Sequence, residues 1–507
     1  MQKTITLLLV LVMISSLLIA CSDNSDSNSG NVTTLANGGE NNVGESVETE
    51  PVDPLEARKL VNDELPEYDF NGETFKIVCE DDQLSHYISE EITGDVVNDA
   101  IYERNAAIGE RFNINIVVQF HHTDYGQVGS NITKVVLAGD DEIDLIAHHV
   151  VNAGKLALSE VYMNWGEVPY IDFSKPWWSP STTEDLTYNG VTLLAVGDVS
   201  LGSIGRTYCV FFDKVKAADY GIDGLYDLVW NGTWTIDKLS EITRDIYIDV
   251  NGNDTRDFDD FYGLATGSNS NIGAYLWAFD NPVMKKDSTG TPTLSVKTEK
   301  MNTMVEKLCD LYYLNTGTFA DKTYVSTIDA VGAGHTTGRD MFYYGNTIFA
   351  NGYIDMAIDV FREVENDYGI IPYPKWTEAQ ERYRSLVDGN FAALAIPMSA
   401  ANLDKAGIIT EALCAESYKS VVPAYYDVAM KVKFTRDAES VEMLDLLMES
   451  RMFDFGYIYD GWSGCSFVLE DLVKNNNTNF ESRYATDETK ITTHFGKVIE
   501  LFESYMQ

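Results

Sequence analysis

Positive charge is scarce in this chain of 507 residues. Lysine and arginine together number 36, against 79 aspartates and glutamates, so the formal net charge is -43. A chain with this balance repels nucleic acids and anionic membrane surfaces. We therefore expect no nucleic-acid partner, and a neutral or cationic ligand is favoured.

Cysteine and the common catalytic motifs are also scarce or missing. Besides Cys21 the chain has five widely spaced cysteines and no CxxC pair, so the pattern predicts buried free thiols and neither a disulfide framework nor a zinc site. The motifs GxSxG, HExxH and GxxxxGK[ST] do not occur. Nucleotide-dependent and serine- or zinc-dependent enzymes of these types are therefore disfavoured.

Only one long apolar run is present, and it lies at the start of the chain. The run from residue 5 to residue 19 follows Lys3 and ends in Leu18-Ile19-Ala20-Cys21. It is shorter than the ~20 residues that span a bilayer, and it ends in small residues and a cysteine. This pattern predicts a lipoprotein signal peptide over residues 1–20 and lipidation of Cys21; the alternative is an ordinary secretory signal.

The residues after Cys21 are too polar to form a core. Residues 21–64 are mostly Ser, Asn, Asp, Gly, Glu and Thr, a composition that predicts a disordered tether. Together with the signal peptide, the tether predicts a protein on the extracellular face of the cell membrane. The membrane would hold it through the lipid anchor only.

More than 400 residues remain, which is enough for two domains or lobes. Their hydrophobic periodicity predicts strands and helices in alternation, which is typical of a doubly wound parallel sheet. The expected order in the first lobe is strand 74–78, helix 95–112, strand 115–120, helix 132–138 and strand 143–147. Further strands are expected at 208–212, 347–350 and 391–396, and further helices after Thr235, near 441–448 and at 494–505.

Several segments, in their order and spacing, resemble one protein family. They are Val97–Asn105, Lys175–Trp178, Gly197–Ser200, Trp234–Leu239, Tyr368–Lys375 and Glu411–Ser417. They resemble the family-1 extracellular solute-binding lipoproteins of ABC importers, a group that includes the maltose-binding proteins, and in particular its long Gram-positive members. The resemblance spans nearly all of the mature chain.

The resemblance implies an α/β fold of the periplasmic-binding-protein-like type II. Two doubly wound α/β lobes would be joined by hinge strands, with a ligand cleft between them. The boundaries expected on this basis are 65–208 and 396–430 for lobe 1, and 209–395 and 431–507 for lobe 2. The chain would cross between the lobes near 208–212, near 391–396 and again near 425–433.

The same resemblance implies a binding protein and not an enzyme. It would capture a carbohydrate, expected to be an oligosaccharide, as a monomer, and deliver it to the permease of an ABC transporter. Two alternatives stay open: a surface glycan-binding protein or glycoside hydrolase, and a receptor for peptides or other polar solutes on the same fold.

A sugar site needs aromatic platforms and polar groups that hydrogen-bond to hydroxyls, and doubly wound lobes place such groups at the carboxyl ends of their strands. Glu80 and Asp82 follow the first predicted strand, and His148 and His149 follow the third. We expect them in the cleft; the alternatives are a solvated turn and an outward-facing histidine pair. The aromatic candidates are Trp177, Trp178, Trp277, Tyr353 and Trp462, of which one of the first two is expected to belong to the core. Trp165, Trp230, Trp234 and Trp376 are expected in the core.

An acidic loop at residues 249–260 has the spacing of a calcium loop. The expected oxygen ligands are Asp249, Asn251, Asn253, Thr255, Asp257 and Asp260. Asp254 replaces the usual glycine, and Asp260 replaces the usual longer glutamate. The loop therefore predicts a possible structural Ca²⁺ site and no other cofactor, with an acidic surface loop as the alternative.

Overall fold

The computed structural model of the chain describes residues 54–179, 184–267, 270–320, 337–426 and 438–506. The predicted signal peptide, Cys21 and most of the predicted tether lie outside these residues. Residues 53–507 form one compact unit. Within the described part of the chain, no helix is both long and apolar enough to cross a membrane.

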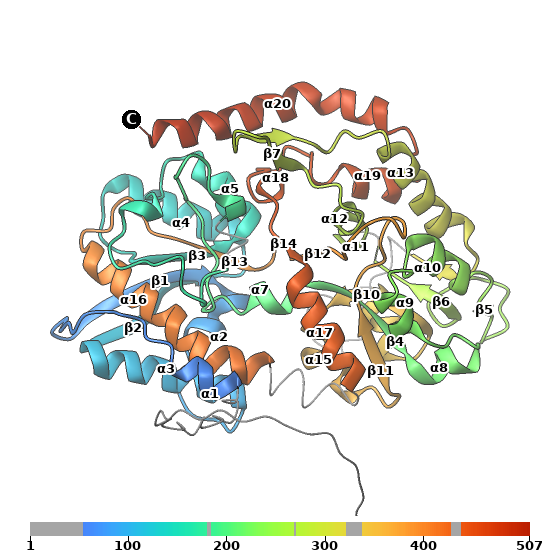
Figure 1. Cartoon of the computed structure of the whole chain (residues 1–507), viewed down its shortest axis with the longest axis horizontal. Helices are drawn as coiled ribbons and strands as arrows, with labels where there is room; N and C mark the ends of the chain where they lie inside the picture. The colour runs from blue at the N-terminus through green and yellow to red at the C-terminus, as the bar shows by residue number, and fades with distance from the viewer. Residues whose placement is uncertain (1–53, 180–183, 268–269, 321–336, 427–437, 507) are drawn as a thin grey trace, which may run out of the picture. The chain divides into compact units, whose positions relative to one another are not determined.

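The first sheet has four strands in the order β13-β3-β1-β2 (Figure 1). β1 pairs in parallel with β2 and β3, and β13 pairs antiparallel with β3. The strands are β1 (Glu73–Glu80), β2 (Ile114–His122), β3 (Leu145–His149) and β13 (Ala392–Ala395). The three strands predicted before residue 150 are thereby confirmed.

Alternation of side chains along β1 explains why helices cover both faces of this sheet. Val78 packs with Val128 and Ile132 on one side, whereas Ile77 packs with Ile108 and Ile409 on the other. The covering helices are α4 (Tyr125–Ala138) and α5 (Val150–Ala157) on the first side, and α3 (Val96–Phe112) and α16 (Leu403–Glu416) on the second. The lobe is therefore doubly wound, as predicted.

The helix α1 (Pro54–Lys59) lies inside residues 21–64, which were predicted to be a disordered tether.

The second sheet has six strands in the order β11-β4-β10-β6-β5, with β9 beside β6. They are β4 (Tyr208–Asp213), β5 (Tyr247–Ile248), β6 (Phe261–Ala265), β9 (Thr318–Phe319), β10 (Thr347–Tyr353) and β11 (Tyr368–Ile371). Its helices are α8 (Lys214–Asp219), α9 (Leu225–Trp230), α10 (Ile236–Thr243), α11 (Ser270–Gly273), α12 (Tyr275–Ala278), α13 (Met301–Cys309), α14 (Thr337–Tyr343), α15 (Met356–Asp359) and α17 (Ala438–Ser450). β7 (Met284–Lys286) and β8 (Pro292–Leu294) form an antiparallel hairpin, and β12 (Ser385–Leu386) pairs in parallel with the distant β14 (Arg451–Met452).

Two segments cross between the sheets side by side. The first contains α7 (Gly202–Gly205) and leads into β4, and the second runs from Val387 to β13. Thr207 bridges Val387, and the Asp388 amide donates to the Arg206 carbonyl at 2.9 Å. β13 belongs to the first sheet, although the predicted boundary placed residues up to 395 in lobe 2. A short apolar strand does not reveal from its sequence which of two sheets it joins.

Three helices end the chain: α18 (Phe455–Ile458), α19 (Val468–Lys474) and α20 (Phe480–Ser504). α20 passes α13 and α18 (Figure 1), and its last turn reaches the first lobe, where the Tyr505 hydroxyl donates to the Tyr162 carbonyl at 2.6 Å. The five cysteines of the described chain are all free and buried, which confirms the prediction of isolated thiols.

Candidate functional site

The cleft between the two sheets is the candidate site. A cavity of about 770 Å³ opens where the carboxyl end of β1, the crossing segment around α7 and the turn after β10 meet. Its lining is mostly polar, and five carboxylates in it face two guanidinium groups. The charged residues and the histidine that line it are Asp82, His86, Asp95, Arg206, Asp355, Asp359, Arg362 and Glu363.

Arg206 lies at the centre of this cavity, directly after α7. Its Nε is 3.2 Å from Asp355 Oδ2, and its guanidinium lies 5.3 Å from the centroid of the Tyr353 ring. Burial opposes the charge of Arg206, but Asp355 and Tyr353 outweigh it and raise the pKa of the guanidinium. Burial raises the pKa of Asp355 to about 7 despite the nearby guanidinium.

The predicted residues of the first lobe lie at the carboxyl ends of β1 and β3, as expected. Asp82 lines the cavity and is exposed. Glu80 and His148 are each 1% exposed, and His148 Nδ1 donates to Glu80 Oε1 at 2.5 Å. These two side chains therefore pair with each other. Glu80 also accepts from the His149 amide, so the pair fixes the backbone at the end of β3.

His149 is buried and is not among the residues that line the cavity. It caps α5 by accepting from the Asn152 amide, and its ring lies 4.5 Å from that of Tyr125. Burial, together with His148, lowers the pKa of His149 to about 4. The imidazole is therefore neutral at physiological pH.

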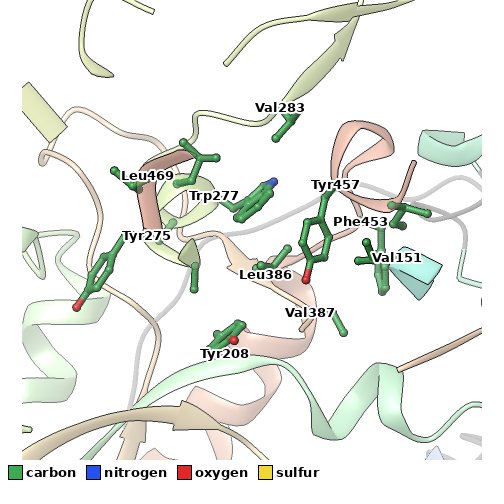
Figure 2. Close-up of a cluster of buried hydrophobic side chains, with 14 of the residues drawn as sticks. Val151, Tyr208, Tyr275, Trp277, Val283, Leu386, Val387, Phe453, Tyr457 and Leu469 are labelled. Carbon is green, nitrogen blue, oxygen red and sulfur yellow. The ribbon is translucent and has the colours of Figure 1, made fainter. Parts of the chain in front are cut away.

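Tyr353 and Trp277 come from the second lobe. Tyr353 ends β10 and packs against the rings of Tyr208 and the guanidinium of Arg206, which places it beside the cavity. Trp277 is buried among apolar and tyrosine side chains, next to Tyr457 and Val283 (Figure 2), and its indole donates to Asp454 Oδ2 at 2.7 Å. Its role in this structure is packing.

Trp462 follows α18 and forms a hydrogen bond to α5 of the first lobe. It is 47% exposed, its ring stacks on Phe467 at 5.0 Å, and its indole N–H donates to Asn152 Oδ1 of α5 at 3.2 Å. Its φ of 62° is in the left-handed region, which is unusual for a bulky side chain and is often seen at functional sites. Trp462 stays our candidate stacking platform.

Trp177 and Trp178 are both in the core and not at a cleft surface. Both are fully buried, and their indole nitrogens donate to the two oxygens of Glu411 at 2.8 and 2.9 Å. Only one of the two was expected in the core, but the buried carboxylate satisfies both indoles. Of the four tryptophans predicted in the core, Trp165 and Trp234 are buried, Trp376 is partly buried, and Trp230 is 51% exposed.

The acidic loop contains turns closed by its own carboxylates. Asp249 accepts from the amides of Gly252, Asn253 and Asp254, whereas Asp260 is buried and accepts from the Val250 amide and the Tyr247 hydroxyl. Among the described residues, no group of three or more His, Cys, Asp or Glu side chains is arranged to hold a metal ion. Calcium binding by this loop stays a prediction.

Sequence reasoning missed His86, Arg206, Asp355 and Asp388. Asp388 accepts from the Tyr208 hydroxyl at 2.6 Å and lies in the second crossing segment. The one usable signal was Arg206, a lone cation between a Gly-Ser-Ile-Gly run and a buried strand. His86 lies on the single-turn helix α2, and Asp355 and Asp388 lie in short turns or loops; none of these segments is long enough to show periodicity.

Sequence comparison finds no relative: no protein-family model matches the chain, and no curated protein matches it. Solved structures do match, at low identity. The ABC substrate-binding protein Lmo0181 of Listeria monocytogenes, in complex with cycloalternan, has a TM-score of 0.51 and 10% identity and covers 84% of this chain and 99% of its own.

Two further neighbours are similar over the same extent. The GacH receptor of Streptomyces glaucescens, solved unliganded and with acarbose, has a TM-score of 0.53 and 12% identity, covering 83% of this chain and 99% of its own. UgpB of Mycobacterium tuberculosis, in complex with glycerophosphocholine, has a TM-score of 0.52 and 13% identity, covering 84% and 98%. These neighbours are binding proteins, and their likeness to this chain is one of fold. The chain therefore has the two-lobed α/β fold of the maltose-binding-protein-like substrate-binding proteins, periplasmic-binding-protein-like type II, as the sequence predicted.

Proposed function

We propose that this protein is an extracellular, lipid-anchored receptor that binds an oligosaccharide between its lobes and delivers it to an ABC transporter permease. The observation that carries the proposal is the cavity of about 770 Å³ at the meeting point of both lobes. Its volume lies in the range of small-molecule sites. The fold adds support, because neighbours with this fold were solved with cycloalternan, acarbose or maltose.

The chemistry of the cavity favours a ligand rich in hydroxyl groups. Carboxylates accept hydrogen bonds from hydroxyls, and Asp355 contacts the Arg206 guanidinium in the wall of the cavity. The net charge of -43 disfavours polyanionic glycans. Trp462 and Tyr353 are not among the residues that line the cavity, and we propose them as aromatic faces for the CH-rich side of a sugar ring that extends beyond it.

Binding is tested by isothermal titration calorimetry and tryptophan fluorescence with a panel of neutral oligosaccharides. We expect saturable binding of at least one member, and a loss of affinity of about tenfold or more in Trp462→Ala. Trp230→Ala is the matched control, because Trp230 is similarly exposed but lies on α9. Absence of binding across a broad panel would overturn the carbohydrate assignment.

The anchor is tested separately. Cys21→Ala should leave oligosaccharide binding intact and release the protein from the membrane, with a decrease in cellular uptake. Tethering raises the local concentration beside the permease without any new contact. Normal uptake by the released form would contradict the delivery role.

One observation favours a hydrolase as the second candidate. Asp82 and Asp355 line the same cavity, and the raised pKa of Asp355, about 7, suits a general acid. Reducing-end release from a bound glycan would establish hydrolysis, and its absence would support the receptor. A receptor for other polar solutes is the third candidate, because UgpB was solved with glycerophosphocholine; including that compound in the panel tests it.

A further inference from the structure

His86 has an unusual position in the cavity wall. It lies on α2 (Leu84–Tyr87) and lines the cavity, and its Nδ1 is a fully buried nitrogen that no described group hydrogen-bonds. A buried polar atom without a partner costs about 1–3 kcal/mol. Such an atom in a native structure calls for an explanation, and a ligand is one.

Arg104 reaches α2 from the neighbouring helix α3. It is 2% exposed, and its Nη2 donates to the carbonyls of His86 at 3.1 Å and Tyr87 at 3.0 Å. Its Nη1 donates to Ser417 Oγ and its Nε to Asn105 Oδ1. All four acceptors are uncharged, and no described carboxylate forms an ion pair with this guanidinium.

Burying a cation that pairs only with neutral acceptors costs free energy of desolvation, and the hydrogen bonds that it donates must offset this cost. Burial lowers the pKa of Arg104 to about 10, which reflects that cost. α2 is a single turn, too short to be stable alone, and its last carbonyls need donors from outside the helix. The planar fork of Arg104 supplies two of them and ties α2 to α3.

Burial and two neighbouring guanidinium groups keep the His86 ring uncharged. Burial lowers the pKa of His86 to about 4, and the guanidinium groups of Arg206 and Arg104 contribute in the same direction. A neutral imidazole carries one hydrogen-bond donor and one acceptor. A sugar hydroxyl, which donates and accepts, is complementary to it.

We propose that His86 is a ligand-binding residue of the cleft and that Arg104 is the positioning residue that holds it against the cavity. This proposal rests on the proposed function, because it takes the cavity as the ligand site. It names a specificity-determining pair from two helices of one lobe. Neither residue was among the sequence-based candidates.

The first experiment measures binding of the tightest oligosaccharide of the panel to the full mature chain. We expect His86→Ala to weaken binding about tenfold or more, with little change in the melting temperature. Arg104→Lys keeps a charge but loses the planar fork, so it should also weaken binding while the protein still folds. An unchanged affinity in either variant would overturn the corresponding half of the proposal.

A double-mutant cycle then separates positioning from general destabilisation. If Arg104 acts through His86, Arg104→Lys should have little further effect on affinity in the His86→Ala background. Fully additive losses would contradict the positioning role. Arg111→Lys on the same helix is the matched control, because Arg111 pairs with Asp63 instead; it should leave affinity unchanged.

A ligand-free readout distinguishes failure of this proposal from failure of the proposed function. The imidazole ¹⁵N shifts of His86 should show a neutral ring from pH 5.5 to 8 in the wild type, and they should change in Arg104→Lys but not in Arg111→Lys. If no oligosaccharide binds but these shifts change, the carbohydrate function and the His86 contact fall while the positioning role stands. If oligosaccharides bind and the shifts of Arg104→Lys match the wild type, the positioning role falls alone.

Discussion

Glu411 is the residue on which two adjacent tryptophans depend. It is fully buried on α16, and its two carboxylate oxygens accept the indole N–H groups of Trp177 and Trp178. Burial raises the pKa of Glu411 to about 7 from a usual value of 4.5, although both indoles favour the ionised form. The desolvation of the carboxylate therefore outweighs the hydrogen bonds that it accepts from both indoles and from the Asp172 amide.

This pKa predicts how stability depends on pH. The folded chain holds the Glu411 proton more tightly than the unfolded chain between about pH 4.5 and 7. Its contribution to the free energy of unfolding should fall by about 1.4 kcal/mol per pH unit as pH rises through this window, and level off above it. The free energy of unfolding, measured by urea denaturation at several values between pH 5 and 8, should decrease less steeply with pH in Glu411→Gln than in the wild type. The same dependence on pH in both proteins would contradict the assignment.

At the scale of elements, α7 is closely approached by residues of both lobes. A Cβ on Gly202 would lie 3.0 Å from Gln83 Oε1, on the first-lobe side. One on Gly205 would lie 2.3 Å from the Tyr425 hydroxyl and 3.1 Å from Asp355 Cβ, beside the cavity. These glycines are required for close approach of side chains, not for a left-handed backbone.

Gly205→Ala should therefore displace Tyr425 and disturb the Arg206–Asp355 pair. We expect a loss of about 1–3 kcal/mol in the free energy of unfolding, with weaker oligosaccharide binding. Gly496→Ala on α20 is the matched control, because nothing lies within 4 Å of its Cβ position. It should be neutral or stabilise by about 0.5–1 kcal/mol, since alanine favours a helix interior. Equal behaviour of the two variants would contradict the close-approach argument.

The acidic loop is a second element with a testable property. If residues 249–260 bind calcium, millimolar Ca²⁺ should raise the melting temperature of chelator-treated protein, because a ligand of the folded state stabilises it. Asp257→Asn should remove this increase. Asp260 is less suitable for the test, because it already accepts three hydrogen bonds in the fold and its replacement would destabilise the chain without calcium. If the melting temperature does not rise even at about tenfold higher Ca²⁺, the loop is not a calcium site.

At the scale of the whole molecule, α20 connects the two lobes behind the crossing segments. Near its start, Lys297 contacts Glu481 at 3.3 Å and the Tyr484 ring at 5.3 Å. Near its end, Phe502 is fully buried against Tyr188, Phe455 and Tyr459. A helix of 25 residues extends about 37 Å, enough to contact both lobes.

This connection predicts that the lobes unfold together. The wild type should unfold in a single calorimetric transition, and Phe502→Ala should cost about 3–5 kcal/mol and separate it into two. Glu503→Ala replaces an exposed neighbour on the same helix and should leave one transition at nearly the wild-type temperature. Two transitions in the wild type itself would contradict the coupling.

Local structure was largely predictable because it depends on local periodicity. The alternation in Thr74–Val78 and the apolar stripe of residues 97–108 correspond to β1 and α3, and Thr235 caps α10 by accepting from the Lys238 amide, as expected. The cleft-edge position of Asp82 also followed, since it depends only on where a parallel strand ends.

What the sequence by itself determined is therefore the strands and helices with clear local periodicity, the doubly wound class, the isolated thiols and the charge that disfavours polyanionic partners. Only the tertiary structure decided that β13 joins the first sheet, that Glu411 draws Trp177 and Trp178 into the core, and that His86, Arg206 and Asp355 share one cavity. The physical reason is range. Periodicity and capping act over a few residues, whereas burial, the pairing of charges and the shape of a cavity depend on groups hundreds of residues apart in the chain.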